Sequence, residues 1–339
     1  MTTDQTTRQP TQRATMTALL QDTYGEPSEV LCLATIERPS PEAGEVVVEV
    51  RAAGVDRGVW HLTTGLPYAV RLAGYGVRAP KQHTPGMDVA GVVTDVGADV
   101  TGFEPGDEVF GIAIGSYAEF ARARADKLAT KPANLSFEDA AALSISGLTA
   151  LQAVRDKADV QPGERVLVLG ASGGVGGYAV QIAKAYGAVV TGVGSTAKLD
   201  LIRSLGADQV VDYTVADATD GTQRYDVILD VGGNRSLRHL RRALTSKGRL
   251  VIVGGETGGR WLGGADRQVR AMLWSPFVSQ RMSALLSSEN GGDIAVLAAL
   301  AEAGQITASV ERTFRLQDAA AAIEHVRAGR AHGKVVITP

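Results

Sequence analysis

Two different patterns of apolar and polar residues divide the chain. Up to about residue 135, short Val-rich or alternating segments are separated by Gly and Pro, which predicts strands joined by turns. The predicted strands cover residues 45–53, 88–96, 107–112 and 116–124. Several short strands with turn residues between them favour a compact, barrel-like β domain.

The second pattern begins near residue 136, where Ser136 and the acidic residues after it predict the start of a helix. Continuous Val/Ile/Leu segments then alternate with helical ones. The predicted strands are 165–169, 188–193, 209–213, 226–231 and 249–253, and the predicted helices are 175–186, 197–205 and 235–244. This alternation predicts a doubly wound α/β domain with a parallel sheet buried on both faces.

The pattern is less regular beyond residue 255. We expect a flexible loop at 258–264, strands at 278–287, 306–314 and 334–338, and helices at 294–303 and 319–327. The first fifteen residues are rich in Thr and Gln and are predicted to form a disordered tail.

Composition narrows the function classes. The 339 residues predict two domains or three, and a net charge of −3 argues against nucleic acid or anionic lipid as a partner. No apolar run is long enough to span a membrane, and the start has no hydrophobic signal segment. The single cysteine, Cys32, excludes an internal disulfide and fits a cytoplasmic protein. Because Cys32 stands among apolar residues, we expect a buried, structural thiol.

A glycine-rich loop is the strongest chemical signal. Predicted strand 165–169 leads directly into Gly-Ala-Ser-Gly-Gly-Val-Gly-Gly at 170–177 and then into a predicted helix. Glycines allow the backbone to approach a pyrophosphate, and the helix N-terminus attracts its charge. The loop residues expected to bind a dinucleotide are Ser172, Gly173, Gly174 and Val175.

The end of the next predicted strand bears on the choice of cofactor. A carboxylate there would favour NAD by binding the ribose hydroxyls, but the sequence has Gly194-Ser-Thr-Ala-Lys198 instead. Ser195, Thr196 and Lys198 offer two hydroxyls and a cation, which suit a 2′-phosphate. We therefore predict NADP(H) as the cofactor.

The ordered motifs of the whole chain resemble the medium-chain dehydrogenase/reductase superfamily, in its zinc-free quinone oxidoreductase branch. The motifs that carry the resemblance are Pro85-Gly-Met-Asp-Val-Ala-Gly-Val92, Gly106-Asp-Glu-Val-Phe-Gly111, Gly147-Leu-Thr-Ala150, the loop at 170–176, Ser204-Leu-Gly-Ala-Asp208 and Gly333-Lys-Val-Val336. The resemblance implies an α/β protein with a GroES-like β-rich catalytic domain and a Rossmann domain. The implied boundaries are 1–15 for the tail, 16–137 for the catalytic domain, 138–305 for the Rossmann domain and 306–339 for the return to the catalytic domain.

The resemblance also implies further cofactor contacts and a homodimer. Thr149 would face the nicotinamide, and Tyr213 would lie near the adenine or the 2′-phosphate. The remaining implied positions are Val231, Gly232, Val253, Gly254, Gly255 and Lys334. The segment 278–287 stands where an edge strand of the family often pairs between subunits.

The sequence departs from the zinc alcohol dehydrogenases of this superfamily. Where those enzymes have Gly-His-Glu, this chain has Gly86-Met87-Asp88, and the cysteines of their structural zinc are absent. The five histidines are scattered, so we expect no metal site. A conjugated carbonyl needs less help than an alcohol, because charge spreads onto an oxygen that one or two donors can stabilise.

The stretch 56–68 matches the wall of the family's active site. His61 is the first candidate for donor or general acid because imidazole titrates near neutral pH. Tyr68 is the second candidate, and Asp56 stands where relatives often have Asn. We expect an NADPH-dependent reductase of a quinone or an α,β-unsaturated carbonyl compound. Two alternatives stay open. One is a zinc-free NADP-dependent carbonyl reductase or alcohol dehydrogenase, or an enoyl-thioester reductase, and the other is an NADPH-binding protein without catalytic activity.

Overall fold

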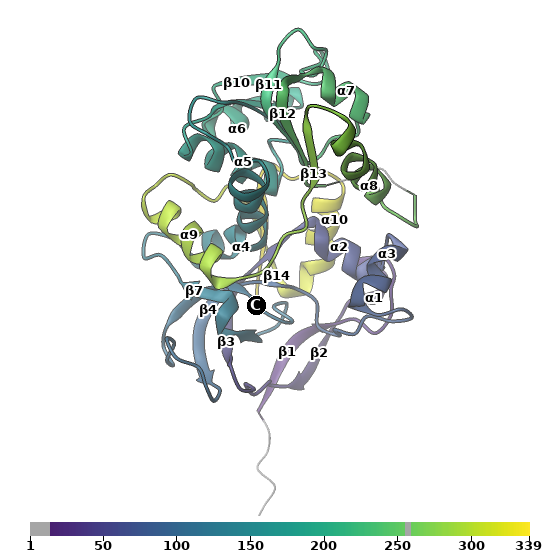
Figure 1. The fold of residues 1–339 in the computed structure, drawn as a ribbon. Coiled ribbons are helices and arrows are strands. Elements are labelled where there is room, and N and C mark those ends of the chain that lie inside the picture. The colour runs from purple at the N-terminus through teal and green to yellow at the C-terminus, as the bar shows by residue number, and fades with distance from the viewer. Residues whose placement is uncertain (1–13, 255–258) are drawn as a thin grey trace, which may run out of the picture.

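Two large β-sheets organise the residues that this computed structural model describes, 14–254 and 259–339 (Figure 1). The lower sheet in Figure 1 has seven strands in the order β14-β15-β3-β4-β5-β7, and β6 pairs with β3. Its strands are β3 (Glu45–Val55), β4 (Asp88–Val96), β5 (Glu108–Ile112), β6 (Phe120–Arg124), β7 (Leu128–Thr130), β14 (Val310–Arg315) and β15 (Lys334–Thr338). The last strand pairs antiparallel with β3, so the C-terminal segment completes the sheet that begins near the N-terminus.

A small antiparallel pair, β1 (Thr15–Leu20) and β2 (Cys32–Glu37), lies beside the lower sheet. An isolated bridge between Ala18 and Ala118 connects the two. Three short helices cover this part of the molecule: α1 (Pro27–Val30), α2 (Arg57–Thr64) and α3 (Tyr68–Val70). Helix α10 (Ala319–Arg327) packs against α1 and α2, which brings the chain end to the same region.

The upper sheet is parallel throughout and has six strands in the order β10-β9-β8-β11-β12-β13. They are β8 (Arg165–Leu169), β9 (Val189–Gly194), β10 (Gln209–Asp212), β11 (Tyr225–Asp230), β12 (Leu244–Ile252) and β13 (Arg281–Ala284). The helices that accompany them are α5 (Gly174–Ala185), α6 (Leu199–Ser204), α7 (Leu237–Arg242) and α8 (Ala265–Trp274). The order reverses beside β8, and ligands of such sheets bind at this switch point, outside the carboxyl ends of the strands.

Helix α4 (Phe137–Gln152) connects the two sheets. Its start is fixed by Ser136, whose hydroxyl accepts a hydrogen bond from the Asp139 N–H at 3.0 Å. It packs against β3, β4 and β5 on one side and against α5 and α9 (Gly291–Glu302) on the other. Phe110 of the lower sheet and Val166 of the upper sheet accordingly belong to one buried cluster.

The predicted fold class is confirmed: a GroES-like β-rich part and a doubly wound parallel sheet are both present. The domain boundaries at 137/138 and 305/306 stay predictions. The predicted tail lies outside the described residues except for Ala14 and Thr15, and Thr15 already begins β1. None of the helices within residues 14–254 and 259–339 is long and apolar enough to cross a membrane.

Some elements differ from the expectation. The strands expected at 116–124 and 278–287 are shorter, as β6 and β13, and α8 follows the loop expected at 258–264, of which Gly258 lies outside the described residues. Helix α8 has no side-chain cap and exposes most of its apolar residues, so it lacks the usual sequence signals of a helix. The prediction for Cys32 was wrong, because this thiol is exposed at the start of a two-stranded sheet.

Candidate active site

The turn between β8 and α5 has the backbone geometry of an anion-binding loop. Gly170 has a φ of +80°, which favours glycine. A Cβ atom on Gly176 would lie 2.0 Å from the Gly170 carbonyl oxygen, so only glycine allows this close approach. Helix α5 begins after Gly173 and has no side-chain cap, which leaves its first N–H groups to be satisfied by a ligand or by water. The residues present therefore fit a pyrophosphate.

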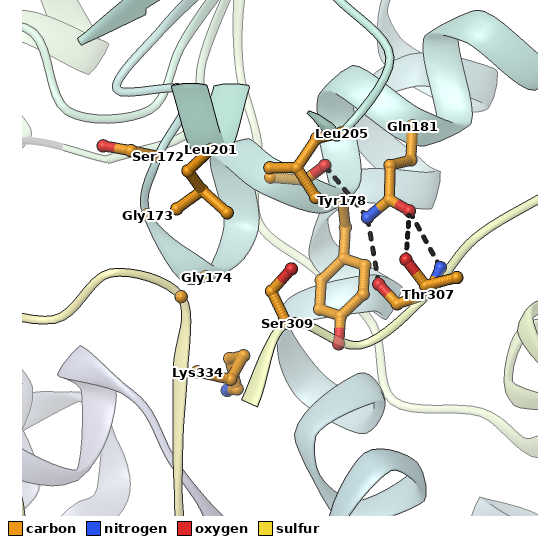
Figure 2. A pocket seen from close by; sticks show the side chains of 12 residues that line it. Ser172, Gly173, Gly174, Tyr178, Gln181, Leu201, Leu205, Thr307, Ser309 and Lys334 are labelled. Carbon is orange, nitrogen blue, oxygen red and sulfur yellow. Dashed lines mark hydrogen bonds between the residues drawn. The ribbon is translucent and has the colours of Figure 1, made fainter. Parts of the chain in front are cut away.

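A small cavity adjoins this loop (Figure 2). Ser172, Gly173 and Gly174 line it together with Lys334, and Figure 2 shows Lys334 beside Ser309 and close to the loop. The Lys334 side chain is buried, and its Nζ donates a hydrogen bond to Ser146 Oγ at 2.9 Å. The structure thus places a buried ammonium group close to the expected pyrophosphate. Val175, the fourth predicted loop residue, lies in the first turn of α5 and packs against the core.

The predicted 2′-phosphate site contains an acid that the sequence analysis missed. Asp212 ends β10 and pairs in register with Gly194, the last residue of β9. Thr196 donates a hydrogen bond to Asp212 Oδ2 at 2.5 Å. Hydrogen bonds from Thr196 and Thr214 lower the pKa of Asp212, so this carboxylate is ionised at neutral pH. The missed signal was the end of the neighbouring strand, which parallel pairing brings to the same edge of the sheet.

The other predicted groups of this site have different surroundings. Lys198 Nζ donates hydrogen bonds to the carbonyls of Gly329 and Ala331 at 3.0 and 2.7 Å. Burial lowers the pKa of Lys198. Ser195 precedes a short helical turn at 196–198, and the Tyr213 ring is exposed. The cation is therefore near the site but engaged with backbone oxygens.

The predicted nicotinamide contacts gather at the carboxyl ends of the central strands. Val231 and Gly232 follow β11, and Val253 and Gly254 follow β12. Gly255 lies outside the described residues. Thr149 is on α4, where its hydroxyl donates to the Ile145 carbonyl at 2.8 Å. Thr149 thus lies on the helix between the two sheets, and the other described positions lie at the carboxyl edge of the parallel sheet.

A cavity of about 330 Å³ lies between the two sheets, and two of the three predicted catalytic residues form part of its wall. Asp56 and His61 line it from the lower part of the molecule, and Ile145 and Leu148 of α4 line it from the opposite side. The sequence analysis missed Tyr75 and Glu289 as lining residues, because both stand in connecting segments that only the folded chain brings together.

Helix α2 positions the two predicted residues. Asp56 is its N-cap and accepts hydrogen bonds from the N–H groups of Gly58 and Val59 at 2.6 and 3.3 Å. His61 Nδ1 lies 2.7 Å from the Leu66 carbonyl oxygen. Because a carbonyl can only accept, Nδ1 carries the proton of the neutral ring, and Nε2 is then an acceptor.

Tyr68, the third predicted residue, lies on α3 and is not among the residues that line this cavity. Its ring packs edge-to-face against Trp261 at a centroid distance of 5.2 Å. The Arg71 guanidinium lies 4.9 Å from the centre of the same ring. The neighbours Pro67 and Val70 do line the cavity, so Tyr68 supports its wall.

A buried carboxyl group stands behind the cleft. Asp88 is 1% exposed, and its Oδ1 accepts a hydrogen bond from the Ile145 N–H at 2.6 Å. Burial raises the pKa of Asp88 to about 7; Lys334 opposes this shift, and Asp56 adds to it. The sequence analysis noted Asp88 only as part of a motif, because nothing local shows that it inserts between the sheets.

Met87 lines the cavity where the zinc dehydrogenases of the resemblance have histidine. Within residues 14–254 and 259–339, no three His, Cys, Asp or Glu side chains form a group that could hold a metal ion. A thioether is a poor ligand for Zn²⁺ beside the usual imidazole, thiolate and carboxylate.

Comparison with known proteins agrees with this architecture. Residues 42–133 match the family model of the alcohol dehydrogenase GroES-like domain, and residues 205–337 match that of zinc-binding dehydrogenases. The quinone oxidoreductase of Sus scrofa is 34% identical over 70% of this chain and 73% of its own length. The mitochondrial NAD(P)H oxidoreductase RTN4IP1 of Mus musculus is 32% identical over 95% of this chain and 89% of its own.

Two solved structures have the same fold over nearly the whole chain. The quinone oxidoreductase from Coxiella burnetii superposes with a TM-score of 0.83 at 27% identity, covering 96% of this chain and all of its own. The CurK enoyl reductase superposes with a TM-score of 0.82 at 26% identity, covering 95% and 99%. The protein is accordingly an oxidoreductase with a nicotinamide cofactor. The chain belongs to the medium-chain dehydrogenase/reductase superfamily, in its quinone oxidoreductase-like branch.

Proposed function

We propose that this protein is a zinc-independent, NADPH-dependent reductase that transfers a hydride to a quinone or an α,β-unsaturated carbonyl compound. The observation that carries the proposal is the cleft, which has Asp56 and His61 on one side and α4 on the other. The bound nicotinamide supplies the hydride. A conjugated acceptor placed in the cleft would need a donor for the oxygen that gains charge.

His61 is the donor in this proposal. With Nδ1 donating to the Leu66 carbonyl, a neutral ring has no proton at Nε2, so the imidazolium is the form that donates to substrate. The bond to Leu66 also fixes the ring orientation, which reduces the entropy lost on reaching the reactive geometry. Asp56 holds the first turn of α2 and so positions His61, one turn further along the same helix.

Zinc independence rests on the chemistry of the donor set. Met87 occupies the position of a ligand histidine, and the possible metal ligands that line the cleft are His61, Asp56 and Glu289. Lys127 Nζ donates a hydrogen bond to Glu289, and in the described part of the chain no three His, Cys, Asp or Glu side chains form a group of the kind that a catalytic zinc site needs. Measurement of zinc in the purified protein tests this point, and a stoichiometric content would contradict it.

The preference for NADPH rests on Ser195, Thr196 and Lys198 near the end of β9. Asp212 acts in the opposite direction, because its charge is held beside Thr196. A cation that leaves its backbone carbonyls for a 2′-phosphate exchanges neutral partners for a doubly charged one, which favours phosphate binding. The preference for NADPH over NADH therefore depends on whether the attraction of Lys198 for the 2′-phosphate exceeds the repulsion from Asp212.

A homodimer is part of the proposal. Strand β13 is the edge of the upper sheet, and the helix before it exposes a group of large apolar side chains. They are Val269, Met272, Leu273, Trp274 and Phe277. Large exposed apolar side chains that follow one another in α8 and the short turn 275–277, next to an edge strand, favour an interface. Light scattering after gel filtration tests it: the wild type is expected to be dimeric, and Phe277→Asp is expected to be monomeric.

We also propose a cytoplasmic location and a small-molecule substrate as the partner. The names of some relatives include "mitochondrial" or "chloroplastic". Cell fractionation with a compartment marker tests the location.

The likeness to the CurK enoyl reductase favours one further candidate, reduction of an enoyl thioester. Both candidates share the chemistry of hydride addition to a conjugated carbon. We do not favour the hypothesis of a non-catalytic nucleotide-binding protein, because relatives that match most of this chain are named oxidoreductases.

The experiment is the oxidation of NADPH and of NADH against four acceptors: a quinone, an α,β-unsaturated ketone, a saturated ketone and an enoyl-CoA. Turnover of the quinone or the enone with NADPH is the expected result. Turnover of the saturated ketone alone would support a carbonyl reductase, and turnover of the enoyl-CoA alone would support the thioester candidate. A clear preference for NADH would contradict the cofactor assignment.

A further inference from the structure

A second cavity, of about 250 Å³, adjoins the cleft. Four residues line both: Leu62, Tyr75, Met87 and Glu289. The cavity extends from these residues into the lower part of the molecule, toward the strand β5. None of the groups assigned to the cofactor lines it. Because the two cavities adjoin, a substrate that reacts in the first cavity can extend its non-reacting part into the second.

The walls of this second cavity are mainly apolar. Val59, Ile112 and Ala113 line it with at most 4% of their surface exposed. Two buried polar side chains stand in the wall, those of Gln21 and Thr84. Gln21 is engaged within the protein, since its Nε2 donates to the carbonyls of Thr23 and Thr63 at 3.0 and 2.6 Å. Such a wall offers little to a polar ligand and favours hydrocarbon.

The cations in the wall of the cavity already have partners. Arg124 donates to Asp126 at 2.5 and 2.9 Å. Lys127 donates to Glu289 at 2.5 Å. An anionic arm, such as the phosphate-bearing arm of a CoA thioester, would have to displace these carboxylates. The charges therefore favour a neutral substituent over an anionic one.

The volume limits the size of that substituent. An apolar cavity of about 150 Å³ holds benzene, which has six carbon atoms. By the same ratio, a cavity of about 250 Å³ holds about ten carbon atoms. A tail of this length fills the space, and a longer one extends to the exposed edge beside Ile114.

We propose that the second cavity binds an apolar tail of the electrophile, so that the preferred substrates are quinones or enones with a hydrocarbon substituent of up to about ten carbon atoms. The inference rests on the proposed function, because the reacting ring occupies the first cavity. The tail is held by burial of hydrocarbon alone, and the reactive carbonyl then lies beside His61.

The test is a series of 2-alkyl-1,4-benzoquinones with tails from methyl to dodecyl. Each methylene that leaves water is worth up to about fourfold in kcat/KM, so an increase of at least about tenfold is expected before the value levels off. The levelling is expected near the tail length that fills the cavity.

Two variants locate the tail. Ala113→Leu fills the buried wall, and Ile114→Phe narrows the exposed edge with little risk to folding, because Ile114 is 44% exposed. Ala113→Leu should remove most of the dependence on tail length, and Ile114→Phe should lower kcat/KM for tails long enough to extend past this edge. Both variants should leave the methyl compound within about twofold of wild type. Leu33→Phe is the matched control, since Leu33 is 45% exposed and lines neither cavity.

The outcomes separate the two proposals. Turnover of the methyl compound without any gain from longer tails would overturn the tail subsite and leave the proposed function in place. A gain that persists in both variants would place the tail elsewhere and would also overturn the subsite. Failure to reduce any quinone or enone would overturn both proposals.

Discussion

Lys334 donates a hydrogen bond to Ser146 across 2.9 Å and thereby joins the last strand of the lower sheet to the helix between the two sheets. Its side chain is only 3% exposed and passes beneath the glycine loop. A Cβ atom on Gly174 would lie 2.9 Å from Lys334 Cδ, so the lysine side chain can pack here only against a glycine. The contact couples the geometry of the loop to the packing between the sheets.

The first prediction concerns this buried cation. Lys334→Met is expected to weaken NADPH binding about tenfold or more, because a hydrogen-bonding cation near the pyrophosphate is lost. It also removes the cation that opposes the rise of the Asp88 pKa, so the pH-dependent loss of stability described below should extend to higher pH. Titration of NADPH fluorescence and urea unfolding measure the two effects. Lys247→Met is the control, since Lys247 is exposed on β12, and an equal loss there would contradict the assignment.

The second prediction concerns the loop itself. Gly176→Ala introduces a methyl group 2.0 Å from the Gly170 carbonyl oxygen, so the turn must shift. We expect NADPH binding to fall below detection while the far-UV circular dichroism remains that of a folded α/β protein. Gly259→Ala serves as the control because, apart from its chain neighbours, no described residue has an atom within 4 Å of the added carbon. Normal NADPH affinity in Gly176→Ala would show that the cofactor binds elsewhere.

The third prediction concerns pH. The native state keeps a proton on Asp88 up to about pH 7, whereas the unfolded chain releases it near the ordinary value of 3.8. Stability is therefore expected to fall as pH rises between these values, by on the order of 4 kcal/mol in total. Asp88→Asn removes the titrating group and should flatten this part of the profile.

Urea unfolding at about pH 5 and about pH 8 measures the effect. Asp318→Asn, at an exposed position, should leave the wild-type profile unchanged. If Asp88→Asn keeps the full pH dependence, another group is responsible for it.

The sequence alone allowed the fold class and the cofactor loop to be predicted, because both depend on local patterns. The strand 165–169, the glycines after it and the helix that follows are consecutive in the chain. The pairing of Thr196 with Asp212 was not predictable in this way, since it depends on parallel register between two strands. The exposure of Cys32 was mispredicted because β2 pairs only with β1 in the described sheet: Ala18 and Leu19 of β1 are buried, whereas the residues of β2 are exposed or half-buried.

The candidate cleft shows the same limit. His61 and Asp56 share one short helix, so one local segment was enough to nominate both. Glu289 and Tyr75 reach the same cavity from segments more than two hundred residues apart. Asp88 was visible in a motif, but its burial depends on α4 crossing the lower sheet at Ile145.

The fourth prediction concerns the choice between NADPH and NADH. Asp212→Asn removes a charge beside Thr196 and is expected to raise the preference for NADPH by about three- to tenfold, since a like charge near the 2′-phosphate is unfavourable. Lys198→Met is expected to lower the same preference. The ratio of kcat/KM for the two cofactors measures both effects. This ratio must rise in Asp212→Asn and fall in Lys198→Met. A change in the same direction in both variants would contradict the placement of the 2′-phosphate.

The last prediction concerns proton donation in the cleft. His61→Gln keeps a hydrogen-bonding side chain but cannot transfer a proton, so kcat is expected to fall by about one hundredfold to ten-thousandfold. NADPH affinity should stay within about twofold, because His61 lines the cleft and not the glycine loop. Tyr68→Phe is the comparison: its ring packs on Trp261 outside the cavity lining, so the loss of its hydroxyl should change kcat by less than about threefold. A large loss of kcat in Tyr68→Phe with little change in His61→Gln would transfer the donor role to the tyrosine and would require α3 to turn toward the substrate.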